Sequence, residues 1–374
     1  MSIKISSHFD AGAIDVVNAL SSDQIQLNLR KDSHADFMQW FYFRLQGARN
    51  ETCSIRILNA GEATYPSGWE GYRAVASYDR EEWFRVDTEF DGKVMTIRHT
   101  PTEDSVYYAY FEPYSWERHL SLLGRAAYSP VVRLEDLGST VDGRDLNMLV
   151  IGDESAEQKI WVIARQHPGE TMAEWLVEGM LDALLDVANP VARKILQKAV
   201  LYVVPNMNPD GSVRGNLRTN AAGANLNREW MTPSIEKSPE VFYVKNKMHA
   251  TGCDLFLDIH GDEGLPYVFV AGNEMLQNFS DQQIAEQQAF VDNFVKASPD
   301  FQTQFGYPPD KYYDDMLKLA SKYVGHHFKC VALTLELPFK DNIELPDVIV
   351  GWDGDRSAKL GEALLQPILA HINR

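Results

Sequence analysis

Cysteine is scarce in this chain of 374 residues, and long hydrophobic runs are absent from it. The three cysteines, Cys53, Cys253 and Cys330, lie far apart in apolar surroundings and form no Cys-x-x-Cys pair. This usage indicates reduced thiols in the core of a protein from a reducing compartment. The first ten residues, MSIKISSHFD, have no apolar core of a signal peptide, and no run approaches transmembrane length. We therefore expect a cytoplasmic protein.

Basic residues are also few compared with acidic ones. The chain has 35 Lys and Arg against 53 Asp and Glu, which gives a net charge of −18. This charge argues against nucleic acid or an anionic membrane as a partner. It gives no hint about the substrate, because a pocket often differs in sign from the whole molecule. The length suffices for one large domain or two ordinary ones with an ample core.

Residues 1–120 contain short alternating or aromatic runs with few helical stretches. These runs fall at residues 25–29, 40–45, 53–58, 83–86, 94–98 and 106–111, separated by turn-rich pieces. Their pattern predicts an antiparallel β-sandwich domain over residues 1–120. We interpret the aromatic residues of QWFYFRL as core packing rather than a sugar-stacking face, because strand aromatics usually fill sandwiches.

From about residue 130 the strands alternate with longer helices. Strand candidates lie at residues 148–151, 160–164, 200–204, 255–259 and 331–335, and helical stretches at 171–188, 190–198, 239–250, 281–296 and 312–323. This alternation predicts an α/β domain over residues 121–374, with a mixed central sheet and helices on both faces. Ligands bind beyond the carboxyl ends of the strands in such sheets, so the polar residues just after these runs form the candidate site.

The strand at residues 160–164 is followed by a turn at Pro168 and Gly169 and then by a long amphipathic helix. His167 and Glu170 stand three residues apart on this turn, so one nitrogen and one oxygen ligand are presented from one rigid point. The pair is weak evidence by itself, since His260 and Glu263 have the same spacing.

His260 follows the strand at residues 255–259, and Asp258 points to the same face, from which it could orient the imidazole ring. A histidine capped by its local turn is the alternative for this segment alone. Two histidines and one glutamate with an open fourth position are the arrangement of catalytic zinc sites. Such a triad also accepts Co²⁺, Mn²⁺ or Fe²⁺, but zinc is the metal we expect.

Two further stretches carry candidate catalytic and binding residues. Glu336 follows the strand at residues 331–335, and a buried unpaired carboxylate is too costly to have many structural uses. We interpret it as a general base that takes a proton from water and passes it to the leaving amine. Arg218, Asn227 and Arg228 offer planar donors suited to a carboxylate and a carbonyl oxygen. The alternative is a solvated basic loop, which is less favoured in so acidic a chain.

In this order, HPGE, NPDG, GNLRTNAAGANLNREW, DIHGDE and the glutamate of LTLELPF resemble the zinc metallocarboxypeptidases of the carboxypeptidase A superfamily, peptidase family M14. They are most similar to its cytosolic carboxypeptidase branch. QWFYFRL and YYAYFEPYSWERH resemble the N-terminal β-sandwich domain of that branch. The resemblance therefore covers nearly the whole chain.

The resemblance implies a zinc carboxypeptidase with one zinc ion per chain and with peptide or protein C-termini as substrates. It further implies that glutamate-rich termini are substrates, because the cytosolic carboxypeptidase branch is known to prefer glutamates. It implies that His167, Glu170 and His260 bind the metal and that Glu336 is the general base. It also implies that Arg218 stabilises the oxyanion, and that Asn227 and Arg228 hold the terminal carboxylate of the substrate.

Two features of the family have no motif that anchors them here. A substrate-capping tyrosine is expected some twenty residues before the base, where Tyr312 and Tyr313 lie. Ser321 and Lys322 lie near the expected position of the residue that selects the terminal side chain, and a lysine there would suit an acidic residue.

Two alternatives accompany the carboxypeptidase. One is a zinc amidohydrolase of N-acyl amino acids, of the desuccinylase or aspartoacylase type, which shares the zinc triad and an Asn-Arg pair. NPDG, Trp230 and the N-terminal sandwich favour the peptidase over it. The other is a peptide-binding protein without catalysis, which the complete set of expected catalytic residues disfavours.

Overall fold

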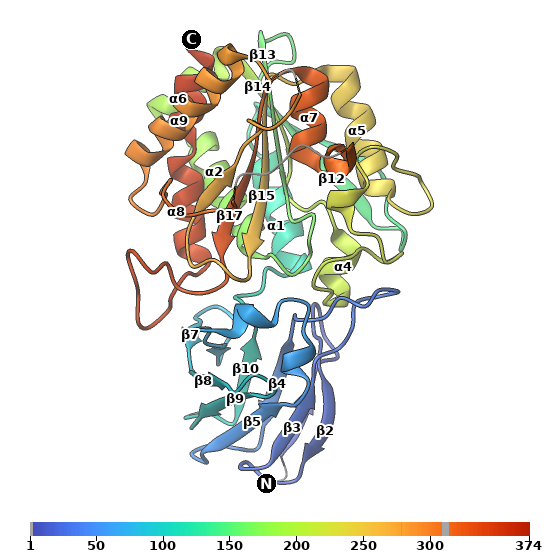
Figure 1. Ribbon diagram of the computed structural model, residues 1–374, viewed down its shortest axis with the longest axis vertical. Helices are drawn as coiled ribbons and strands as arrows, with labels where there is room; N and C mark the ends of the chain where they lie inside the picture. Colours follow the sequence, from blue (N-terminus) through green and yellow to red (C-terminus); the bar gives the residue numbers. More distant parts are fainter. Residues whose placement is uncertain (1–2, 278, 309–313) are drawn as a thin grey trace.

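The computed structural model describes residues 3–277, 279–308 and 314–374. Figure 1 shows an all-β part, which contains the N-terminus, below a larger part in which helices flank a central sheet. None of the described helices is long and apolar enough to cross a membrane.

The N-terminal part contains two five-stranded sheets within the described residues, in the orders β1-β4-β10-β6-β7 and β2-β3-β5-β9-β8. The strands and short helices are β1 Lys4–Ser6, β2 Asp15–Ala19, β3 Ile25–Asn28, β4 Tyr42–Gln46, β5 Cys53–Ile57, η1 Ala60–Glu62, η2 Pro66–Trp69, β6 Val75–Ser77, β7 Phe84–Arg85, β8 Asp87–Phe90, β9 Met95–His99 and β10 Ser105–Ala109. The neighbouring strands are antiparallel, except that β3 and β5 are parallel. The predicted antiparallel sandwich is confirmed with this one exception.

The aromatic run at residues 40–43, which leads into β4, packs inside the sandwich. Trp40, Phe41 and Phe43 are buried. The ring of Phe43 stacks on that of Tyr108 in β10, with 5.4 Å between the ring centroids. These side chains are therefore core residues, as predicted, and they do not form an exposed stacking face.

The second part is built on a seven-stranded sheet of described residues in the order β11-β12-β14-β13-β15-β17-β16. Its elements are α1 Trp116–Ala127, β11 Val132–Ser139, β12 Asp145–Ile151, β13 Gln158–Ala164, α2 Met172–Leu185, α3 Pro190–Leu196, β14 Ala199–Val204, α4 Pro209–Arg214, η3 Leu226–Arg228, α5 Pro239–Thr251, β15 Leu255–Asp262, β16 Phe269–Ala271, α6 Asp281–Ala297, η4 Asp314–Lys318, α7 Ala320–Phe328, β17 Val331–Pro338, α8 Gly354–Ala363 and α9 Leu365–Ile372. Strands β14, β13, β15 and β17 are parallel, whereas β11, β12 and β16 run antiparallel to their neighbours, so the predicted mixed sheet is confirmed.

Helices cover both faces of this sheet because successive side chains of its strands point to opposite faces. Ile160 and Val162 of β13 belong to the apolar cluster that includes residues of α2, α8 and α9. Trp161 and Ile163 belong to a second cluster with residues of α5 and α7. Figure 1 shows α2, α8 and α9 on one side of the sheet and α5 and α7 on the other.

The helix predicted over residues 312–323 is wrong in its bounds. The described chain has η4 at Asp314–Lys318 and α7 at Ala320–Phe328. Leu319 between them has an extended backbone, with ψ at 141°, so one continuous helix cannot form. The division of the chain at residue 120 stays a prediction, since α1 spans that position.

The carboxyl ends of the central parallel strands lie at one edge of the sheet and point toward the N-terminal sandwich (Figure 1). The register pairs Ala164 of β13 with Ile259 of β15, and His260 with Glu336 of β17. The predicted site residues that follow these strands therefore lie between the two parts of the molecule.

Candidate metal centre and active site

The turn after β13 carries two of the predicted metal ligands. Arg165 begins it with a φ of +59°, a left-handed conformation that is strained for a residue with a side chain. The Arg165 guanidinium donates to the carbonyl oxygen of Pro168 at 3.0 Å. A Cβ at Gly169 would lie 2.9 Å from a backbone oxygen of the neighbouring loop, so only glycine fits. The turn is thus fixed, and His167 and Glu170 contact each other within it.

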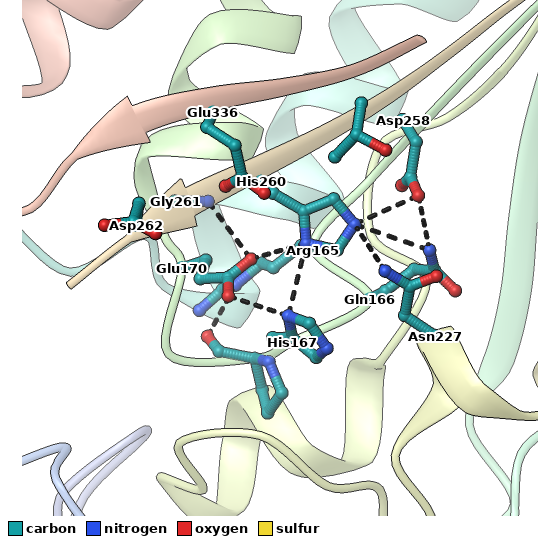
Figure 2. A network of polar contacts seen from close by, with 12 residues as sticks. Arg165, Gln166, His167, Glu170, Asn227, Asp258, His260, Gly261, Asp262 and Glu336 are labelled. Carbon is teal, nitrogen blue, oxygen red and sulfur yellow. Dashed lines mark hydrogen bonds and ion pairs between the residues drawn. The ribbon is translucent and has the colours of Figure 1, made fainter. Parts of the chain in front are cut away.

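The three predicted metal ligands meet in one buried cluster (Figure 2). The Glu170 carboxylate lies 2.7 Å from Nδ1 of His167 and 2.8 Å from Nδ1 of His260. One potential ligand atom from each residue lies within 4.8 Å of the other two. Two imidazole nitrogens and one carboxylate, taken together, are the donor set that zinc prefers in catalytic sites. These residues therefore fit a divalent metal ion.

Polar neighbours hold both imidazole rings in the orientation that a metal requires. Nε2 of His260 lies 3.0 Å from Oδ2 of Asp258, as the sequence suggested. Nε2 of His167 lies 3.1 Å from Oδ1 of Asn225, a contact that sequence reasoning missed. With the proton on Nε2, each ring would present the lone pair of its Nδ1 to a metal ion bound beside Glu170.

The protonation of the cluster favours a cation. Burial and then the charge of Arg218 lower the pKa of His167 to about 3, so its ring is neutral. Burial opposes ionisation of Glu170, but His167 and His260 outweigh it and lower the pKa of that carboxyl. Burial also opposes charge on His260, yet Asp258 and Glu170 raise its pKa well above the ordinary value. The surroundings of this ring are thus strongly negative and suit a bound cation.

Glu336 lies beside the cluster on the neighbouring strand, in register with His260. Burial raises the pKa of Glu336 to about 8, and the charge of Glu170 adds to this shift. Its Oε1 accepts a hydrogen bond from the Tyr307 hydroxyl at 3.1 Å. Its Oε2 is buried and accepts no hydrogen bond from the described residues. A buried carboxylate with an unsatisfied oxygen is suited to accept a proton from a reacting group.

The predicted substrate-binding residues lie on the loop between α4 and α5. The guanidinium of Arg218 lies 5.4 Å from the centroid of the Tyr65 ring, which belongs to the N-terminal part. Oδ1 of Asn227 accepts a hydrogen bond from the backbone N–H of Ala320 at 2.9 Å, which leaves its amide nitrogen directed to the cluster. Nη1 of Arg228 donates to the carbonyl oxygen of Asn227 at 2.8 Å.

All the predicted site residues border one cavity of about 480 Å³. The predicted residues in the wall of this cavity are His167, Glu170, Arg218, Asn227, Arg228, His260 and Glu336. A larger cavity of about 710 Å³ adjoins it and shares Ala271, Tyr307 and Lys322. None of the metal-ligand candidates lines the larger cavity, so we assign the chemistry to the smaller one.

Ser321 and Lys322, the candidates for recognition of the terminal side chain, also line the smaller cavity. Oγ of Ser321 lies 2.8 Å from Oγ1 of Thr334. The Lys322 ammonium donates to the carbonyl oxygen of Gly272, and its side chain is buried. The wall of the cavity therefore contains a positively charged side chain.

Tyr312 and Tyr313, the candidates for the capping tyrosine, lie outside the described residues. Tyr307 contacts the site instead: its hydroxyl lies 2.7 Å from Oδ2 of Asp262 and 3.1 Å from Glu336. Sequence reasoning missed it, because the neighbouring Gly-Tyr-Pro-Pro indicates only a turn.

Comparison with known proteins agrees with the fold. Residues 120–349 match the zinc carboxypeptidase family, and residues 5–111 match the cytosolic carboxypeptidase N-terminal domain. The chain therefore belongs to the zinc carboxypeptidase family. It is a metallocarboxypeptidase, and thus a hydrolase, whose N-terminal region is of the cytosolic carboxypeptidase type.

Solved structures resemble the whole chain. A metallo-carboxypeptidase from Burkholderia cenocepacia is 59% identical, with a TM-score of 0.98 and full coverage of both chains. A metallo-carboxypeptidase from Pseudomonas aeruginosa, in complex with (2-guanidinoethylmercapto)succinic acid, is 42% identical, with a TM-score of 0.96 and 99% of each chain covered.

Among curated proteins, an uncharacterized protein of Zymomonas mobilis is 44% identical over 100% of this chain and 97% of its own length. Cytosolic carboxypeptidase 1 of Danio rerio is 28% identical over 72% of this chain, a match that spans only 28% of that relative. These relatives favour the peptidase over the N-acyl amino acid hydrolase.

Proposed function

We propose that this protein is a zinc-dependent carboxypeptidase that removes residues from the free C-termini of peptides or proteins. The observation that carries the proposal is the meeting of the His167, Glu170 and His260 cluster with Glu336 at the wall of one cavity. A metal triad and a base on neighbouring strands are the parts that hydrolysis by an activated water requires.

In this proposal His167, Glu170 and His260 hold one zinc ion per chain. A bound zinc ion supplies a Lewis acid that lowers the pKa of water and polarises a carbonyl group. Asp258 and Asn225 contact the Nε2 atoms of His260 and His167 and so keep the two rings oriented. This orientation supports coordination of the metal by the Nδ1 atoms.

Glu336 acts in the proposal as the general base. Its carboxylate takes a proton from the attacking water and later delivers that proton to the leaving amine. The buried position supports this role, because a carboxyl with its pKa raised to about 8 holds and releases a proton near neutral pH.

Arg218 and the Asn227–Arg228 pair act on the substrate. Arg218 stabilises the negative charge that develops on the scissile carbonyl oxygen, since its guanidinium is half-buried and permanently charged. Asn227 and Arg228 hold the terminal α-carboxylate at the cavity wall. This contact restricts cleavage to a chain end, because only the end supplies a carboxylate at that place.

We further propose that acidic terminal residues, glutamate in particular, are preferred. The support is the buried Lys322 ammonium in the cavity wall, where a second carboxylate would find a positive charge in a poorly solvated place. A cytoplasmic location belongs to the same proposal and is supported by the three free, buried cysteines.

The test is a mass-spectrometric digest of a mixed peptide library by zinc-loaded protein, with and without a chelator. The library includes oligoglutamates, C-terminally amidated controls and acetyl-aspartate. Chelator-sensitive loss of single residues from free C-termini is the expected result, with glutamate released fastest. Cleavage of acetyl-aspartate without peptide trimming would replace the proposal with the amidohydrolase.

A further inference from the structure

The N-terminal sandwich closely contacts the end of α4 and the following loop, which carries Arg218. The carbonyl oxygen of Val213 accepts a hydrogen bond from the Ala11 N–H at 3.0 Å. A Cβ on Gly215 would lie 2.6 Å from the Ala11 carbonyl oxygen, and Gly215 has a φ of +69°. A Cβ on Gly223 would lie 2.5 Å from the carbonyl oxygen of His34. Glycines on the loop therefore allow its backbone to approach the sandwich.

Within this contact, one carboxylate from the sandwich accepts a series of backbone hydrogen bonds. Oδ1 of Asp32 accepts from the N–H of Leu217 at 2.6 Å. Its Oδ2 accepts from the N–H groups of Arg218 and Thr219 at 2.7 and 2.9 Å, and from the Thr219 hydroxyl at 3.1 Å. Asp32 is only 6% exposed, so these hydrogen bonds replace its hydration. Three consecutive residues of the loop are thus fixed by one side chain.

The same part of the molecule also contacts the guanidinium of Arg218. The guanidinium carbon lies 5.8 Å from the ring centroid of Phe37 and 5.4 Å from that of Tyr65. Cations at such distances are attracted to aromatic rings, more strongly where water is excluded. Asp32 therefore fixes the backbone of Arg218, and the two rings restrict its side chain.

We propose that the N-terminal sandwich contributes to the active site. Its Asp32 is a positioning residue that holds Arg218 in place. The inference rests on the proposed role of Arg218 in stabilising the oxyanion. A donor for a developing charge is effective when it is held in place before the reaction, because no reorganisation is then needed. The competing explanation is that Asp32 only joins the two parts of the protein, which would affect stability but not the action of Arg218.

The experiment is a double-mutant cycle of Asp32→Asn and Arg218→Ala in the full-length, zinc-loaded protein. Asparagine keeps the shape of the side chain but presents an NH₂ group to backbone N–H groups. We expect Asp32→Asn to lower kcat about 100-fold, since a displacement of roughly 1 Å has that effect. We expect kcat/KM to fall by the same factor, as it does when an interaction of the transition state is lost. In the Arg218→Ala background, Asp32→Asn should have no further effect.

Ser33→Ala is the matched control, because Ser33 lies in the same contact but hydrogen-bonds Asn216 and Arg214 rather than Arg218. It should leave kcat unchanged. If Asp32→Asn does not fold, Phe37→Leu tests the same coupling through the aromatic contact and should also lose its effect in the Arg218→Ala background.

Equal losses of activity in both backgrounds, or loss of thermal stability alone, would overturn the positioning role. Zinc content, measured for every variant, should stay at one ion per chain. An inactive wild-type protein on the whole peptide library would instead contradict the proposed function, so the two failures are distinguishable.

Discussion

Two buried clusters of histidine and glutamate lie four residues apart along the chain, one around Glu170 and one around Glu174. In the second cluster every charge has a partner. Oε2 of Glu174 accepts from Nη1 of Arg165 at 2.7 Å and from the Asn206 amide at 3.2 Å, and Oε1 lies 2.6 Å from Nδ1 of His119. Glu174 is fully buried and does not line the cavity of the active site.

The cluster around Glu170 differs in the hydrogen bonding of the carboxyls beside it and in its position. Besides Glu170, the buried carboxyls of Glu263 and Glu336 line the same cavity, and each has an oxygen with no hydrogen-bond donor among the described residues. Burial raises the pKa of both of these carboxyls. The comparison teaches that residue types do not separate a structural cluster from a metal site. Buried carboxyl oxygens without a hydrogen-bond donor, at the wall of a cavity, do so.

Substitution of the two glutamates gives the largest effect and the sharpest contrast. We expect Glu170→Ala to abolish zinc binding and peptide cleavage, because one of three ligands is lost. Metal analysis and turnover measure both. Removal of zinc from the wild type by a chelator should also lower Tm, since a ligand at 1,000 times its Kd stabilises the folded state by about 4 kcal/mol. A chelator without effect on Tm would contradict a metal at this cluster.

Glu336→Gln separates the ligands from the base. The variant should keep one zinc ion per chain and lose about 10²–10⁴-fold in kcat, which is the usual contribution of a placed base. Metal analysis and steady-state kinetics on one preparation decide the outcome. Zinc loss in this variant would mean that Glu336 is a ligand rather than the base.

Glu174→Ala should break the structural cluster and spare the metal. It leaves Arg165 buried without its carboxylate partner, and removal of one partner of a buried pair costs about 3–5 kcal/mol. Urea unfolding should record this loss. Zinc content of the folded protein should equal that of the wild type, in contrast to Glu170→Ala. Loss of zinc at unchanged stability would reverse the assignment of the two clusters.

Arg228→Ala tests the substrate side of the metal cluster. Hydrogen bonds to charged groups contribute about 1.5–3 kcal/mol, so kcat/KM for peptides with a free C-terminus should fall about 10- to 100-fold. The residual slow cleavage of C-terminally amidated peptides, which lack the carboxylate, should be unaffected. Equal losses for both kinds of peptide would show that Arg228 does not hold the carboxylate.

The smallest effect concerns Glu112, another buried glutamate, which forms no salt bridge among the described residues. Burial raises its pKa to about 8, against 4.5 for the unperturbed group. Below pH 4.5 both the folded and the unfolded state are protonated. Between pH 4.5 and about pH 8 the unfolded state releases the proton and the folded state retains it. The free energy of unfolding therefore falls as the pH rises.

Glu112→Gln removes this titration. Between pH 6 and pH 7 the free energy of unfolding of the variant should gain about 1.4 kcal/mol relative to the wild type, the equivalent of one pH unit for one proton. Urea unfolding at both pH values measures the difference. A difference that shrinks as the pH rises would contradict a raised pKa.

Local patterns predicted the central strands of the sheet and the polar residues that follow them, but they missed α1, α8, α9, β11 and β16. Apolar runs located β13, β15 and β17, and the polar residues directly after them, His167, His260 and Glu336, do meet at one cavity. This succeeds because the carboxyl ends of parallel strands lie at one edge of a sheet. The roles of these residues remain proposals.

Contacts between distant segments could not be predicted. Asn225, Tyr307 and Asp32 approach the site from loops, and nothing in their local sequence distinguishes them from other turn residues. The parallel pairing of β3 with β5 and the break at Leu319 also depend on tertiary packing. A single sequence carries little information about such contacts.

The register of β15 and β17 has a consequence for how the chain avoids misfolding. A shift of one residue between these strands would turn Glu336 from the cavity to the opposite face of the sheet, because side chains alternate along a strand. There its carboxylate would meet the apolar side chains under the helices, where an unpaired charge is very unfavourable. The proposed base therefore also penalises the wrong alignment, and a correctly assembled sheet is the arrangement in which the candidate site is complete.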